Sequence, residues 1–125
     1  AALVGGIAGT SFYTKRHFKE DIVTGPNVTE VFKLSRYNPN LEGTIGDSDV
    51  YVLKGEKEGG SLGVLGNIHA NEPSGHMAGI ILEENAKVEA GTIYVIPNIN
   101  NSALTHNDPL DGSPPAVHAL HHKKW

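Results

Sequence analysis

The sequence contains no cysteine and little arginine, and these gaps exclude several kinds of site. Without cysteine there is neither a disulfide nor a thiolate ligand for zinc, and the redox compartment stays open. The arginines are Arg16 and Arg36, and no long run of basic residues occurs. Because the formal net charge is -4 and no basic stripe is present, we expect no nucleic-acid partner.

Apolar residues are also less frequent than in most globular chains. They make up 38% of the sequence, against a norm of about 45–50%. Part of this gap arises because the 15 glycines are counted separately. A chain of 125 residues forms one domain at most and buries about two-thirds of its unfolded surface. We therefore expect a single α/β domain, placed over residues 28–108 by the patterns below.

The most informative segment runs from residue 62 to residue 75. Its apolar residues 62–68 predict a buried strand, and Pro73 suits the first turn of a following helix. Between these elements stand His69 and Glu72, which are residue types that bind zinc. A catalytic zinc ion uses about three protein ligands and keeps one position open for water. The pattern therefore indicates a zinc site at the carboxyl end of a strand, where ligands collect in α/β sheets. The alternative is a loop histidine beside a glutamate that favours the helix N-terminus.

The remaining patterns predict further strands and a helix. Strands are expected over residues 28–37 and 49–54, paired as a sheet edge, because both are rich in β-branched and aromatic residues. A helix is expected from Pro73 to about Lys87, and Gly91 stops it. A buried strand over residues 92–96 follows. Strand, helix and strand at this spacing predict a parallel βαβ unit within a mixed sheet.

Three asparagines follow the last predicted strand. Asn98, Asn100 and Asn101 are expected at its carboxyl end, beside His69 and Glu72. Each amide offers two donors and an acceptor, so the cluster is a candidate for binding a substrate carboxylate or carbonyl. The alternative is a purely local role, because asparagine is favoured in loops.

The segment 66–75 resembles the Gly-Gly-Thr-His-x-Asn-Glu-Pro-x-Gly signature of the succinylglutamate desuccinylase/aspartoacylase family, whose members are related to the zinc carboxypeptidases. The signature's second glycine and its threonine are Asn67 and Ile68 here. The similarity continues through residues 91–103 and reaches back to residues 41–53. It covers roughly residues 28–109, and its specific part is the stretch from the histidine to the glycine.

This resemblance implies that His69 and Glu72 bind zinc in a partial mixed sheet like that of the zinc carboxypeptidases. The implied activity is zinc-dependent removal of an acyl group from an N-acyl amino acid or a related amide. In the family a third zinc ligand and a proton-shuttling glutamate lie further downstream, and an arginine commonly holds a substrate carboxylate. Because no arginine follows the asparagines, we expect the N-terminal portion of such an enzyme, inactive by itself. The alternative is a non-catalytic α/β domain that binds a metal weakly or binds a partner.

The two ends of the chain differ from the domain between them. Residues 1–14 are uncharged and small, and Lys15 and Arg16 follow them. They are too short for a bilayer that needs about 20 helical residues. We therefore read residues 1–27 as the remnant of a signal or membrane anchor plus a linker, or else as a small-residue strand or disordered arm. Localisation follows as membrane-anchored or exported, otherwise cytoplasmic. Residues 109–125, rich in proline and histidine, are expected to be a flexible tail outside the family pattern.

The other histidines are weaker candidates for the missing zinc ligand. His76 follows Glu72 by four residues and so shares its helix face, but a surface position on the helix is the commoner explanation. We expect none of them to complete the site. They are His17, His76, His106, His118, His121 and His122.

Overall fold

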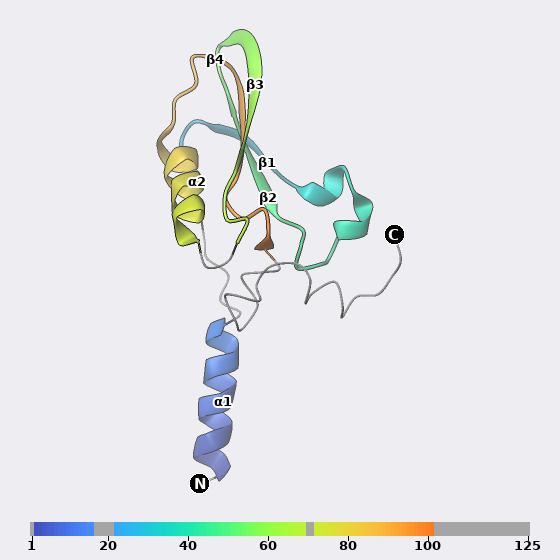
Figure 1. The fold of residues 1–125 in the computed structure, drawn as a ribbon, viewed down its shortest axis with the longest axis vertical. Helices are drawn as coiled ribbons and strands as arrows, with labels where there is room; N and C mark the ends of the chain where they lie inside the picture. Colours follow the sequence, from blue (N-terminus) through green and yellow to red (C-terminus); the bar gives the residue numbers. More distant parts are fainter. Residues whose placement is uncertain (1, 17–21, 70–71, 102–125) are drawn as a thin grey trace.

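The computed structural model describes residues 2–16, 22–69 and 72–101 of the chain. These residues form a small mixed α/β fold with a four-stranded sheet (Figure 1). In chain order the elements are α1 (Ala2–Arg16), β1 (Val28–Lys33), 3-10 helices at Leu34–Arg36 and Pro39–Leu41, β2 (Asp49–Lys54), β3 (Lys57–Leu65), α2 (Pro73–Asn85) and β4 (Ala90–Ile96).

The strands lie in the order β1-β2-β4-β3. β1 pairs antiparallel with β2, as predicted from the two β-rich segments. β2 also pairs antiparallel with β4, which brings Leu53 opposite Ile93. β3 and β4 are parallel, with Val64 opposite Val95, and α2 connects them. The predicted mixed sheet and its βαβ unit are therefore confirmed.

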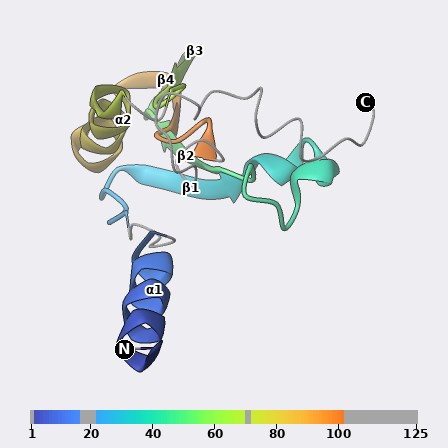
Figure 2. The same cartoon turned by 60° about the horizontal axis from the view of Figure 1, so that its bottom comes forward.

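Helix α2 lies beside one face of the sheet, and the core forms between them (Figures 1 and 2). Leu53 and Val95 are fully buried, and Tyr51 is 6% exposed. Leu82 from α2 and Ile22 from the segment before β1 pack against this cluster. Full burial of an aliphatic side chain such as Leu53 contributes roughly 1.5–3 kcal/mol. The centre of the sheet therefore holds the hydrophobic core of the described residues.

A glutamate is buried in the same interface. Glu83 on α2 has no exposed surface, and its Oε1 accepts a hydrogen bond from the backbone N–H of Gly25 at 2.9 Å. Burial raises the pKa of Glu83, while the bond from Gly25 acts in the opposite direction. A side chain at position 25 would clash with the carbonyl oxygens of Glu83 and Glu84, so the close approach requires glycine. This contact attaches the segment before β1 to α2.

The prediction of a buried strand over residues 62–68 is wrong. The strand is Lys57–Leu65 and lies at an edge of the sheet, where Leu62 and Leu65 are each 55% exposed. An edge strand has a neighbour on one side, and here the core lies under the middle of the sheet. The apolar content of this segment therefore does not lead to burial.

Two other boundaries differ from the prediction. β1 ends at Lys33, because the chain turns into the 3-10 helix Leu34–Arg36 there. α2 ends at Asn85, because Ala86 is already extended. Gly91, predicted to stop the helix, lies within β4 at a φ of +81°, close against Gly60.

The N-terminal residues form a helix, so the predicted alternatives of a strand or a disordered arm are wrong. α1 spans Ala2–Arg16, and its residues 3–11 are all exposed, including Leu3 at 77% and Ile7 at 63%. In Figure 1 it extends away from the sheet. Neither described helix combines the length and the apolar content that crossing a membrane requires. The interpretation of this segment as an anchor remnant stays a prediction, and the predicted tail at 109–125 lies outside the described residues.

Candidate metal and substrate site

The turn after β3 is fixed by backbone contacts to the segment after β4. The N–H of Gly66 donates to the carbonyl of Ile96 at 2.9 Å, and the carbonyl of Gly66 accepts from the N–H of Ile99 at 3.1 Å. A Cβ at Gly66 would lie 2.5 Å from the oxygen of Gly75 and 2.6 Å from that of Pro97. Glycine therefore lets three backbone segments meet at the carboxyl end of the parallel strands.

Asn67 takes the backbone conformation that a glycine would usually provide. Its φ is +53°, in the left-handed region that asparagine tolerates better than most residues. The side chain is 3% exposed, and its Nδ2 donates to Oδ1 of Asn98 at 3.2 Å. The replacement of the signature's second glycine by Asn67 is thus compatible with the turn, and it adds a side-chain link to the loop after β4.

His69 and Glu72 lie together beyond this turn. Nδ1 of His69 is 3.2 Å from Oε2 of Glu72, and the N–H of Glu72 donates to the carbonyl of His69 at 3.1 Å. Both side chains reach solvent, at 50% and 63% exposed. Glu72 precedes Pro73, which is the first residue of α2, but its carboxylate makes no capping hydrogen bond to the helix. The carboxylate faces the imidazole instead, an arrangement that the alternative of a loop histidine partnered by a glutamate at the helix N-terminus also accounts for.

The separation of these two atoms suits a shared zinc ion. Zinc–nitrogen and zinc–oxygen bonds of about 2.0–2.2 Å at a tetrahedral angle place the ligand atoms about 3.4 Å apart. The 3.2 Å between His69 Nδ1 and Glu72 Oε2 is close to that value. The same distance is that of a direct hydrogen bond between the two side chains, so the geometry is compatible with either arrangement.

A third ligand is not present in the described part of the chain. Within residues 2–16, 22–69 and 72–101, no group of three or more histidine, cysteine, aspartate or glutamate side chains is arranged to hold a metal. His76 lies half-buried on α2. The other histidines considered, His17, His106, His118, His121 and His122, lie outside the described residues.

The three predicted substrate-binding asparagines lie in the loop after β4, near the turn. Asn98 Oδ1 accepts from Asn67, Asn100 Nδ2 donates to the carbonyl of Ile68 at 2.9 Å, and Asn101 Nδ2 donates to the carbonyl of Ile45 at 2.8 Å. These bonds hold neighbouring loops in place, which supports the structural alternative for the donors of Asn100 and Asn101. Their substrate-binding role stays a prediction.

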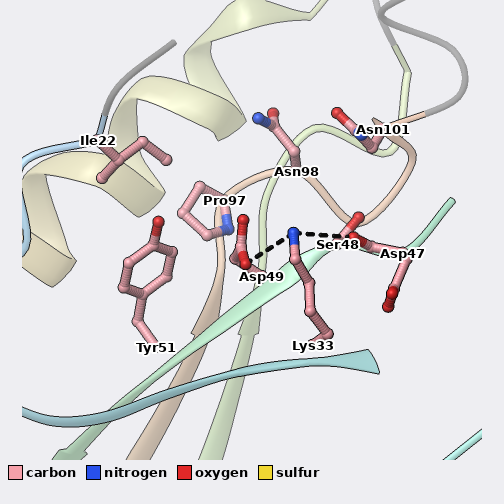
Figure 3. A pocket seen from close by; sticks show the side chains of 9 residues that line it. All are labelled: Ile22, Lys33, Asp47, Ser48, Asp49, Tyr51, Pro97, Asn98 and Asn101. Carbon is pink, nitrogen blue, oxygen red and sulfur yellow. Dashed lines mark hydrogen bonds and ion pairs between the residues drawn. The ribbon is translucent and has the colours of Figure 1, made fainter. Parts of the chain in front are cut away.

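A cavity of about 90 Å³ opens beside this loop, between β1, β2 and Pro97 (Figure 3). Lys33 crosses it and forms an ion pair with Asp49, with Nζ 2.8 Å from Oδ1. Tyr51 also lines the cavity, and burial, together with the charge of Asp49, raises its pKa to about 12. Asn98 and Asn101 contribute to the lining, whereas His69 and Glu72 do not.

Sequence reasoning did not identify Lys33, Asp49 or Tyr51 as site residues. They lie on two strands that precede the recognisable motif, and they come together only through the register of β1 with β2. Their signal in the sequence is a charged residue at a strand end, for Lys33 and Asp49, and a tyrosine within a strand, and both are too common to be informative. Comparisons with protein-family models, with curated proteins and with solved structures found no match.

Proposed function

We propose that this chain carries part of the active site of a zinc-dependent hydrolase that removes an acyl group from an N-acyl amino acid or a related amide. The observation that supports this proposal best is the pair His69 and Glu72, 3.2 Å apart at the carboxyl end of a parallel strand pair. The resemblance of residues 66–75, which include this pair, to the succinylglutamate desuccinylase/aspartoacylase signature also supports it. A zinc carboxypeptidase-like fold, of which this sheet is one part, belongs to the same proposal.

The residues of this chain would act as positioning groups. A bound zinc ion supplies an activated water and polarises the amide carbonyl of a substrate. His69 and Glu72 hold the ion, and the link from Asn67 to Asn98 keeps the loop after β4 against the turn. The exposed setting of the pair leaves room for water and substrate. A further ligand, a proton shuttle and a cationic clamp for a substrate carboxylate are needed for turnover.

One observation favours the second candidate, a non-catalytic α/β domain that binds a metal weakly or binds a partner. The described residues provide two metal ligands but no third. Two ligands leave most of the coordination sphere of zinc to water, and the geometry then stays loosely defined. A chain of this kind binds zinc without organising catalysis.

Zinc titration by calorimetry tests the proposal. We expect the 125-residue chain to bind one zinc ion weakly and to show no turnover of N-acetyl or N-succinyl amino acids. His69→Ala abolishes the binding because it removes half of the protein ligands, whereas the control His76→Ala leaves it unchanged. Unaltered zinc binding in His69→Ala would show that His69 is not a zinc ligand. Tight binding with turnover that is lost in His69→Ala contradicts the expectation of an incomplete enzyme.

A further inference from the structure

The cavity beside the loop after β4 has the size of a small organic group. At about 90 Å³, and with roughly 10–15 Å³ needed for each water-sized position, it holds about six to nine such positions. Polar and apolar groups line different parts of it. Figure 3 shows Lys33 and Asp49 facing one another, with Pro97 and Ile22 beside the hydroxyl of Tyr51.

Lys33 is held in place but keeps hydrogen-bonding capacity. Its Nζ lies 2.8 Å from Oδ1 of Asp49 and donates to the backbone carbonyl of Asp47 at 3.2 Å. An ammonium group has three N–H donors, so these two contacts leave one for a ligand. The hydroxyl of Tyr51 is protonated at neutral pH, because its pKa is about 12, and it is a second donor beside the same space.

The charges around the cavity disfavour a charged ligand. The ammonium of Lys33 and the carboxylate of Asp49 offset one another. Asp47 lines the cavity with its backbone carbonyl, which accepts from Lys33, whereas its carboxylate accepts from the N–H of Ser35 and is turned away (Figure 3). A free carboxylate would therefore lie against Asp49, and a free amine would lie against Lys33. An uncharged group that both accepts and donates hydrogen bonds avoids both repulsions.

We propose that this cavity binds a short, uncharged acyl amide, with an acetamide unit as its smallest form. The carbonyl oxygen of the ligand accepts from Lys33 and Tyr51. The N–H of the ligand donates to Oδ1 of Asn98, which keeps a second lone pair after accepting from Asn67. The apolar end of the acyl group packs against Ile22 and Pro97.

This inference goes beyond the proposed function, because His69 and Glu72 do not line the cavity and an amide bound there is not the bond that a zinc ion at that pair would act on. Asn98 lines the cavity and is bonded to Asn67, two residues before His69. The cavity and the His69–Glu72 pair therefore lie at the same end of the sheet, where β3 and β4 finish.

Titration of the zinc-free, ¹⁵N-labelled full chain by NMR tests the inference, with acetamide, sodium acetate and methylammonium chloride as probes at matched ionic strength. We expect acetamide to shift the amide signals of Lys33, Asp49 and Asn98 saturably. Acetate and methylammonium bind at least about fivefold more weakly, since each meets a like charge that is not fully offset. Equal or tighter binding of either ion, or no saturable shift with acetamide, overturns the proposal.

Three variants locate the binding. Lys33→Met keeps the aliphatic stem and removes the donor, so acetamide affinity falls by about fivefold or more, the usual loss for a hydrogen bond to a charged group. Tyr51→Phe keeps the buried ring and lowers the affinity as well. Lys54→Met, at the exposed far end of β2, is the matched control and leaves it unchanged. Wild-type affinity in both Lys33→Met and Tyr51→Phe overturns the proposal. The two proposals are tested separately, because the acetamide titration uses no zinc. Acetamide binding without zinc binding at His69 contradicts the proposed hydrolase and supports the cavity. Zinc binding at His69 without acetamide binding contradicts the cavity and leaves the proposed hydrolase standing.

Discussion

Strands β2 and β3 differ in apolar content and in surroundings: four of the six residues of β2 are apolar, against three of the nine residues of β3. In β2 the residues Val50, Tyr51, Val52 and Leu53 are all at most 6% exposed. In β3 nearly every residue is exposed, although the strand is longer. β2 lies between two neighbouring strands, whereas β3 has β4 on one side and forms the edge. The central position and the higher apolar content of β2 therefore act together to make it the core strand, whereas even the leucines of β3 stay exposed at the edge.

The sharpest test of this comparison removes one leucine from each strand. Leu53→Ala is expected to lower the free energy of unfolding by about 2–5 kcal/mol, because it leaves a cavity at a fully buried position. Leu62→Ala, at a position that is 55% exposed, is expected to change it by about 0.5 kcal/mol or less. Urea unfolding followed by circular dichroism measures both values. Equal losses in the two variants would show that β3 is covered in solution.

A smaller loss of stability is expected at Gly66, in the turn that follows β3. In Gly66→Ala the new methyl group meets two backbone oxygens, of Gly75 and Pro97, which cannot move aside as a side chain would. We expect a loss of about 1–3 kcal/mol in the free energy of unfolding, typical of overpacking. Gly63→Ala is the matched control, since nothing lies within 4 Å of its added Cβ. A neutral Gly66→Ala would mean that the turn after β3 is looser than described.

The smallest expected effect concerns the buried carboxyl group of Glu83. Its pKa is raised in the folded state above the ordinary value of 4.5, chiefly by burial. The folded state therefore binds the proton more strongly than the unfolded state, and this contribution to stability is full at acid pH. It is lost as the pH rises above 4.5 and through the raised value in the folded protein.

Glu83→Gln separates this titration from the hydrogen bond. Glutamine still accepts from the N–H of Gly25 but cannot ionise. The free energy of unfolding of the variant, measured with urea between pH 4 and pH 8, is expected to lack the decline that Glu83 causes in the wild type. Parallel pH profiles for the two proteins would rule out burial of an ionisable group at this position.

Much of the fold could be predicted because its signals are local. Residues 49–54 contain Val50, Tyr51, Val52 and Leu53 in succession, between a charged residue at each end, and β2 has these same bounds. The βαβ unit also followed from Pro73 at the helix start and from the apolar run that became β4. The edge position of β3 could not be predicted, because it depends on β4 inserting between β2 and β3, which are adjacent in sequence.

Part of the candidate site could likewise be predicted from local sequence, and part could not. His69 and Glu72 are three residues apart in one turn, so their proximity could be predicted from their spacing, and the structure brings them to 3.2 Å. The tolerance of Asn67 for a positive φ could also have been inferred from its residue type. The cavity around Lys33 could not, because its walls come from strands and loops that are joined by the register of the sheet.

The placement of β4 between β2 and β3 also constrains the order of events during synthesis. Leu53 pairs across the sheet with Ile93, forty residues later in the chain. A growing chain therefore presents the hairpin of β1 and β2 with one side unpaired while β3 and α2 emerge from the ribosome. During that interval the apolar strand β2 is a free edge, open to pairing with other nascent chains. The arrival of β4 ends this exposure and transfers the edge to β3.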